Sequence, residues 1–142
     1  MRKLENIVGY PDEINNLIQT VSHSLVEYAN ECIPDWDFSN YYSVYSDGRV
    51  LLVFIRKKKQ ITLSEKNGNV TFTTIPPVRF SIEIPSPMVG SDNNYREITI
   101  RRTLQGEYVE TILDIAELDE IVNQGIYWLM GLVSDFRDYN YE

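Results

Sequence analysis

The sequence predicts a single α+β domain with an N-terminal helix, an antiparallel meander sheet of six to seven strands, and a long C-terminal helix packed on the sheet. Apolar residues recur every three to four positions near both ends of the chain, which is typical of amphipathic helices. Between these ends, apolar and polar residues alternate, and the dipeptides Asp47-Gly48, Asn67-Gly68 and Gln105-Gly106 separate the alternating runs. At 142 residues, the chain has the length of one domain.

The first helix is expected to begin at Asp12 and to end before Pro34. Asp12 and Glu13 favour a helix N-terminus, and the residue before a proline avoids the helical conformation. The apolar stripe between these ends comprises Ile14, Leu17, Ile18, Val21, Leu25, Tyr28, Ala29 and Cys32.

The stretch from Tyr41 to Arg56 predicts a hairpin around Asp47-Gly48, because a tight type I′ turn needs two residues that tolerate positive φ. A two-residue loop would pair Tyr45 with Val50 and Tyr41 with Phe54. The second strand of this hairpin is apolar on both sides. It therefore belongs in the middle of a sheet with both faces covered, or in a sheet whose second face binds a partner.

Two further hairpins are expected. Asn67-Gly68 joins residues 60–65 to 69–74, and Gln105-Gly106 joins residues 96–103 to 108–113, with Arg101 opposite Glu110 as a cross-strand ion pair. Between them, Pro76-Pro77 forces a corner before a half-buried strand over residues 78–84. Consecutive hairpins favour a meander. The second choice of fold is a curved sheet that wraps around the C-terminal helix and holds a ligand cavity.

The last helix is expected to begin with a capping box formed by Asp114 and Glu117. Gly125 and Gly131 predict a close approach of another backbone, and the two helices are expected to lie together across one face of the sheet. The apolar stripe of this helix comprises Ile115, Leu118, Val122, Gly125, Leu129, Leu132 and Phe136.

The formal net charge of −8 disfavours nucleic acid and anionic membranes as partners, because both attract lysine and arginine. No apolar run approaches the roughly 20 residues that cross a bilayer, and the N-terminus lacks a signal-peptide pattern. Cys32 is the only cysteine, so no internal disulfide is predicted. We therefore expect a cytoplasmic protein, in a bacterium or in a phage-infected host.

Positive charge is concentrated in residues 49–66, which carry six basic side chains and one acidic one, whereas residues 114–142 carry one basic side chain and seven acidic ones. A compact basic patch is predicted at Arg56, Lys57, Lys58 and Lys59. Because lysines usually protect an exposed strand edge, this role is favoured over contact with an anion or a nucleic acid.

The residue types that usually carry catalysis form no recognisable constellation. His23 is the only histidine and lies on the polar side of the first helix, while Cys32 lies on its apolar side, where a buried thiol is expected. Asp35 and Asp37 flank Trp36 in a pattern that indicates a turn. We therefore predict no catalytic residue, no metal ligand, no cofactor and no enzymatic activity.

The leading hypothesis is a non-enzymatic acidic protein-binding module of the inhibitor, immunity or phage counter-defence type, which occupies the surface of a basic partner protein. Its candidate binding residues are aromatic, apolar and acidic: Trp36, Tyr41, Tyr45, Met88, Val89, Glu117, Asp119, Glu120, Trp128, Tyr139 and Tyr141. One alternative is a small-ligand-binding domain with a pocket between a curved sheet and the C-terminal helix, lined by Tyr42, Phe54, Phe80, Trp128 and Met130. Another is a phage structural or assembly subunit that forms homo-oligomers through the two-faced strand and the loop over residues 85–94.

Overall fold

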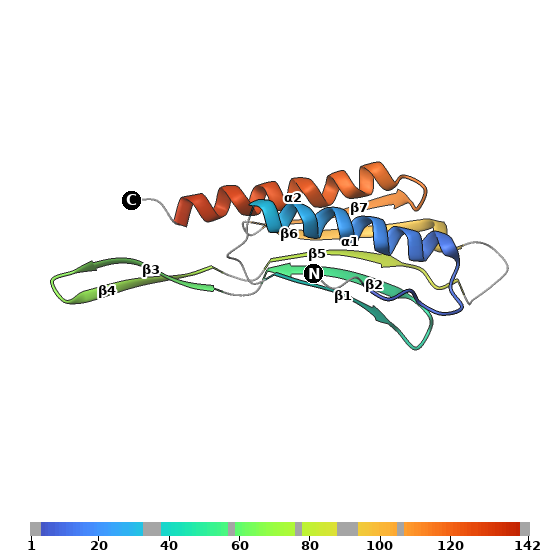
Figure 1. Cartoon of the computed structure of the whole chain (residues 1–142), viewed down its shortest axis with the longest axis horizontal. Helices are drawn as coiled ribbons and strands as arrows, with labels where there is room; N and C mark the ends of the chain where they lie inside the picture. The colour runs from blue at the N-terminus through green and yellow to red at the C-terminus, as the bar shows by residue number, and fades with distance from the viewer. Residues whose placement is uncertain are drawn as a thin grey trace.

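Two layers make up the fold: a five-stranded antiparallel sheet and two helices that lie side by side along it (Figure 1). The computed structural model describes residues 4–32, 38–56, 59–75, 78–87, 94–104 and 107–139, and it describes their side chains except at 59–66, 71–75, 94, 104 and 133–139. The helices are α1 (Asp12–Cys32) and α2 (Leu118–Tyr139), and a short 3-10 helix (Asn94–Arg96) precedes the sixth strand. The main sheet has the order β1-β2-β5-β6-β7, formed by Phe38–Val44, Val50–Arg56, Val78–Ile84, Glu97–Leu104 and Glu107–Asp114.

The prediction of a meander of six to seven strands is wrong, because the strand beside β2 in the sheet is β5 and not the next strand along the chain. These two strands pair directly, with Val50 opposite Ile84 and Arg56 opposite Val78. The chain between them forms a separate two-stranded ribbon of β3 (Lys59–Lys66) and β4 (Asn69–Ile75), which projects beyond the end of the main sheet (Figure 1). The physical reason lies in composition: β2 and β5 carry large apolar residues at alternate positions to bury under the helices, whereas β3 and β4 consist largely of threonine, serine and charged residues.

The first hairpin forms where it was predicted, but its predicted register is wrong by one residue. Val44 lies opposite Val50, and Tyr41 lies opposite Val53 rather than Phe54. The Tyr45 N–H donates to the Arg49 carbonyl at 2.9 Å and the Gly48 N–H donates to the Tyr45 carbonyl at 2.9 Å, with Gly48 at φ 93°. The loop is therefore a three-residue turn that ends in a left-handed glycine, a conformation that Asp-Gly fits as well as a two-residue turn.

The turn at Asn67-Gly68 confirms the sequence analysis, whereas Gln105 and Gly106 lie outside the described residues. Asn67 and Gly68 have φ of 55° and 81°, as a two-residue turn between Lys66 and Asn69 requires. An irregularity between Thr62 and Ser64 shifts the β3–β4 register. In the last hairpin, Arg101 lies opposite Glu110 as predicted.

The core lies between the helices and one face of the sheet. Four aromatic rings, those of Phe38, Phe54, Phe80 and Trp128, form a chain of contacts with centroids 5.7 to 6.3 Å apart. The Trp128 indole N–H donates to the Thr103 carbonyl at 3.1 Å, which satisfies its polar atom inside the core. Around these rings lie Ile14, Leu17, Ile18, Val21 and Leu25 of α1, Val50, Leu52, Ile82, Ile98 and Ile100 of the sheet, and Ile121, Leu129 and Leu132 of α2.

The helices approach each other closely at Gly125. A Cβ atom at this position would lie 2.5 Å from Cδ2 of Leu25, so the absence of a side chain lets α1 and α2 pack. The predicted pairing of the two helices is confirmed, but what approaches Gly125 is the Leu25 side chain rather than a backbone. Within the part of the chain that the structure describes, neither helix is long and apolar enough to cross a membrane.

Arg96 connects the N-terminal ends of both helices. Its guanidinium donates to both carboxylate oxygens of Glu13 at 3.0 Å and to Asp114 at 2.9 Å. The Asp114 N–H in turn donates to Glu117 at 2.9 Å, and the Asp114 carboxylate accepts from the Ala116 N–H at 2.8 Å. The predicted bond between Asp114 and Glu117 is present, but it closes the turn before α2, which begins at Leu118. The Ala116 N–H, together with Arg96, holds the pKa of Asp114 below its ordinary value.

Candidate functional site

One face of the sheet points away from the helices, and we call it the open sheet face. The register places on it Ser39, Tyr41 and Ser43 of β1, Leu51, Val53 and Ile55 of β2, Arg79, Ser81 and Glu83 of β5, Thr99, Arg101 and Thr103 of β6, and Tyr108, Glu110 and Ile112 of β7. Three large side chains on this face are exposed, Tyr41 at 44%, Tyr108 at 60% and Ile112 at 56%, whereas Val53 is 0% exposed. The two-sided apolar character of the second predicted strand thus corresponds to one face under helices and one face that the described helices leave uncovered.

An ion-pair ladder crosses the open sheet face. Glu83 of β5 contacts Arg49 at 3.6 Å and Arg101 at 2.9 Å, and Arg101 also contacts Glu110 of β7 at 3.0 Å. The Tyr108 hydroxyl donates to Glu110 at 3.1 Å. Because Arg101 and Tyr108 both donate to it, the pKa of Glu110 lies below its ordinary value. At the edge of the ladder, the Arg49 guanidinium stacks over the Tyr45 ring at 4.9 Å from its centroid.

A hollow of about 360 Å³ lies on this same face. Tyr45 and Tyr108 line it together with three arginines and one glutamate, which makes its lining more positive than the chain as a whole. The complete lining is Tyr45, Leu51, Arg79, Ser81, Glu83, Arg101, Arg102, Thr103 and Tyr108. Arg79 is exposed and forms no ion pair among the described residues. An anionic group is the chemistry that this lining fits.

The outer surface of the helix layer has the opposite charge. Its exposed carboxylates are Asp12, Glu27 and Glu31 of α1 and Asp119 and Glu120 of α2, and we call this surface the acidic helix face. The described side chains of both helices include no lysine or arginine. His23 is exposed and lies 3.0 Å from Glu27.

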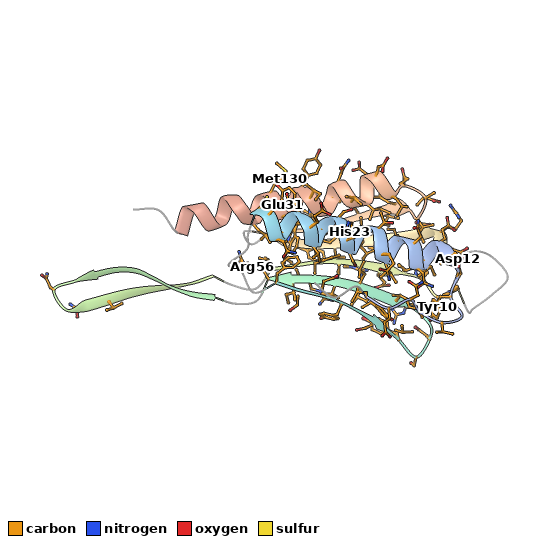
Figure 2. The ribbon with its side chains drawn as sticks, in the orientation of Figure 1. Tyr10, Asp12, His23, Glu31, Arg56 and Met130 are labelled. Carbon is orange, nitrogen blue, oxygen red and sulfur yellow. The ribbon has the colours of Figure 1, made fainter. Side chains whose placement is uncertain are left out.

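Two large side chains interrupt the acidic helix face. Tyr127 is 59% exposed and Met130 is 49% exposed, and both follow Asp119, Glu120 and Asn123 at helical spacing. Figure 2 shows Met130 on the side of α2 away from the strands. An exposed aromatic and an exposed methionine within an acidic surface are side chains that protein interfaces favour.

The predicted binding residues divide into three groups. Tyr41, Tyr45, Glu117, Asp119 and Glu120 are exposed, as a binding role requires. Trp36, Met88, Val89, Tyr141, Lys57 and Lys58 lie outside the described residues, and for Tyr139 and Lys59 only the backbone is described.

Trp128 and Arg56 are buried, so their predicted surface roles are wrong. Trp128 is 0% exposed, because it continues the α2 stripe that faces the sheet. Arg56 is 1% exposed at the end of β2 near the ribbon (Figure 2), because it falls on the same side of the strand as Leu52 and Phe54. The prediction of a buried Cys32 is also wrong, since this thiol is exposed in the last turn of α1.

Sequence reasoning missed Tyr108, Ile112 and Tyr127 as exposed side chains. For Tyr108 and Ile112 a signal existed, because both lie two residues from Glu110 on the same side of the strand, and Glu110 was predicted to form an ion pair with Arg101. For Tyr127 the signal was its spacing from Glu120 on α2.

The ligand pocket proposed between the sheet and the C-terminal helix lies where side chains already fill the space. Phe54, Phe80 and Trp128 are each 0% exposed and contact one another, whereas Met130 lies on the opposite side of α2. The hollow that the structure does show is on the other face of the sheet.

Comparisons of the chain with protein-family models, with curated proteins and with solved structures find no match.

Proposed function

We propose that this protein is a non-enzymatic binding module that uses its acidic helix face to occupy the surface of a basic partner protein. The single observation that carries the proposal is the charge of that face: five exposed carboxylates and no lysine or arginine among the described helix side chains. Carboxylates that share one face create a field that steers a positively charged partner toward it.

Tyr127 and Met130 are the proposed anchors of the interface. Interface energy concentrates in a few aromatic and flexible apolar side chains near the centre, and charged groups around them mainly set orientation and association rate. Both residues lie among the acidic side chains of α2 and remain accessible. Steering by the carboxylates therefore brings a partner onto these two side chains.

A module of this kind acts by blocking what its partner would otherwise contact. Inhibitors, immunity proteins and phage counter-defence proteins work in this way, and the size and charge of this chain fit that class. The cytoplasm is the compartment in which we place this activity.

The experiment compares two charge variants of equal net charge. Glu27→Gln with Glu31→Gln and Glu120→Gln neutralises the acidic helix face, while Glu5→Gln with Glu97→Gln and Glu107→Gln neutralises three exposed carboxylates elsewhere. Each variant and the wild type capture proteins from a lysate of the source cells at about 50 mM and about 500 mM salt. We expect the wild type and the control variant to capture basic proteins at low salt. The helix variant should not capture these proteins, and no variant should capture them at high salt.

A second pair of variants tests the anchors once a captured protein is identified. Tyr127→Ala with Met130→Ala should weaken binding at least about tenfold, as expected for central interface residues. Ile112→Ala, on the open sheet face, is the matched control and should leave affinity unchanged. Equal capture by all variants, independent of salt, contradicts the proposal.

A second candidate function is binding of a small organic anion in the hollow of the open sheet face. Arg79, which has no ion pair among the described residues, and the rings of Tyr45 and Tyr108 favour a carboxylate or phosphate attached to a flat ring. Titration with phenyl phosphate and with benzoate, followed by amide chemical shifts, tests it. Shifts confined to the hollow and abolished by Arg79→Met support the function, and shifts that are absent or spread over the surface oppose it.

A further inference from the structure

Strand β1 is an edge of the main sheet, and no other described strand pairs with its outer side. In an antiparallel ladder, residues alternate between those whose N–H and C=O face the partner strand and those whose groups face away. The bond from the Tyr45 N–H to the Arg49 carbonyl fixes this alternation, so Ser43 and Tyr41 face β2. The N–H and C=O groups of Asn40, Tyr42 and Val44 therefore point away from the sheet.

No described segment pairs with this edge. The N-terminal segment reaches the first hairpin through the Tyr10 hydroxyl, which donates to the Gly48 carbonyl at 2.8 Å. Asn15 binds the N–H and C=O of Ile7 at 2.8 and 3.1 Å, and Gln19 binds the Leu4 carbonyl at 2.6 Å. These bonds hold the N-terminal segment on α1. Among the described residues, it forms no backbone hydrogen bond with β1.

The edge also lacks the features that normally prevent strands from pairing. Proteins protect exposed edges with charged residues, proline or bulges. The sequence of β1, FSNYYSV, contains no charged residue and no proline, and its seven pairs with β2 are in unbroken register. Tyr41 and Val44 are exposed at 44% and 45%. The opposite edge, β7, carries Glu107, Glu110 and Asp114 in eight residues.

We propose that β1 pairs with β1 of a second copy of this chain, in antiparallel orientation about a two-fold axis at Tyr41. Each copy would then contribute its five-stranded sheet to one continuous sheet of ten strands. The outward-facing N–H and C=O groups of Asn40 and Tyr42 of each copy would bond across the seam. This contact is independent of the acidic helix face.

The sequence of β1 is self-complementary when two copies pair in antiparallel orientation. Pairing about Tyr41 matches Phe38 with Val44, Ser39 with Ser43, Asn40 with Tyr42 and Tyr41 with Tyr41, so two apolar residues meet, serines meet serines, and no pair brings like charges together. The same operation on β7 would place Glu107 opposite Asp114, two like charges. Self-complementarity is what an isologous contact requires, and it distinguishes a second copy from an unrelated strand.

Charge gives this contact a recognisable salt dependence. Each copy has a formal net charge of −8, and the seam contains no charged residue to offset the repulsion between copies. Added salt screens that repulsion, so dimerisation should strengthen as salt increases. Binding of a basic partner should weaken over the same range, which separates the two proposals.

Sedimentation velocity over a concentration and salt series tests the seam. We expect the mass to rise from 16.6 kDa to twice that value with increasing concentration, at lower concentration in high salt. Tyr41→Lys and Tyr41→Glu each place like charges opposite each other and should remain monomeric, whereas an equimolar mixture of the two should dimerise. Ile112→Lys, an exposed position on β7, is the control and should dimerise like the wild type.

Amide hydrogen exchange provides a second readout. The Tyr42 and Val44 amides should exchange more slowly in the dimer, whereas the Tyr41 amide, already bonded to β2, should change little. A wild type that stays monomeric at all concentrations, assembles without limit, or dimerises equally well as Tyr41→Lys would overturn the proposal. Circular dichroism shows whether each variant keeps its fold.

Discussion

The two faces of strand β2 have similar apolar sequences but different surroundings. Leu52 and Phe54 face the helices and are 0% exposed, and the side chains around them include the rings of Phe80 and Trp128. Leu51 and Ile55, on the open sheet face, are partly exposed, although Val53 between them is 0% exposed, and the neighbours on this face are tyrosines, serine and ion pairs. Apolar side chains in a strand therefore do not determine which face is covered. The covered face is the one whose neighbouring strands also supply large apolar and aromatic side chains.

The largest expected effect is a difference in the free energy of unfolding. Truncating a side chain under the helices should cost far more than truncating one on the open sheet face. Trp128→Ala should lower the free energy of unfolding by about 3–5 kcal/mol, because it leaves a cavity under the aromatic chain and an unpaired Thr103 carbonyl. Ile112→Ala on the open sheet face should change it by no more than about 0.5 kcal/mol. Urea denaturation of both variants measures the contrast. A large loss for Ile112→Ala would mean that something buries the open sheet face.

A smaller effect is expected where the helices meet. Gly125→Ala places a methyl group against the Leu25 side chain and should cost about 1–3 kcal/mol through overpacking. Adding Leu25→Ala to this variant should cost less than Leu25→Ala does in the wild type, because the new methyl group fills part of the space. A double-mutant cycle by urea denaturation gives the coupling, and additive losses would show that the helices can separate freely.

The next effect concerns the turn before α2 and how its contribution to stability depends on pH. The pKa of Asp114 is lowered in the folded protein by the Ala116 N–H and Arg96, so its ionised form is stabilised by folding. This stability is fully present above the unfolded pKa of about 3.9 and is lost as the pH falls through the lower folded-state pKa. Asp114→Ala should lower the urea midpoint at neutral pH. As the pH falls, the stability of this variant should decrease less steeply than that of the wild type. Asp119→Asn, an exposed neighbour, is the control, and an acid profile unchanged by Asp114→Ala would contradict this role.

The smallest effect is expected from the ion-pair ladder. Arg101 and Glu110 are both partly exposed, so solvent screens their attraction, and replacing Arg101 by Met with Glu110 by Gln should shift the urea midpoint only slightly. The shift should vanish in high salt. A shift as large as that of Trp128→Ala would place the ladder in a buried interface, in disagreement with the exposed tyrosines beside it.

Local patterns in the sequence predicted the elements of the fold well. The helix bounds at Asp12 and Cys32, the bond between Asp114 and Glu117, and the turn at Asn67-Gly68 each depend on neighbouring residues alone, and all three are present. The register of the first hairpin could not be predicted, because Gly48 fits a two-residue or a three-residue loop equally well. One residue of difference was enough to change the partner of Tyr41.

The candidate site was harder to predict, because exposure depends on contacts between distant segments. Arg56 and Trp128 were placed on the surface by residue type, although strand parity and helix spacing put both toward the core. The pairing of β2 with β5 also had no local signal, since it depends on how β5 competes with β3 for the same strand edge. Tyr41 and Tyr45 were predicted as binding residues, and both are exposed. They belong to the hairpin whose second strand was predicted to be apolar on both faces.

The direct pairing of Arg56 with Val78 means that the chain leaves the main sheet and returns to it at neighbouring positions. A connection of a few residues could close this gap, so the segment from 57 to 77 is an insertion that the β2–β5 ladder does not need. Its length and chemistry can change while the helices, the core and both edges of the sheet keep their places. The architecture thus carries an attachment point where an arm of different reach or specificity can be grafted.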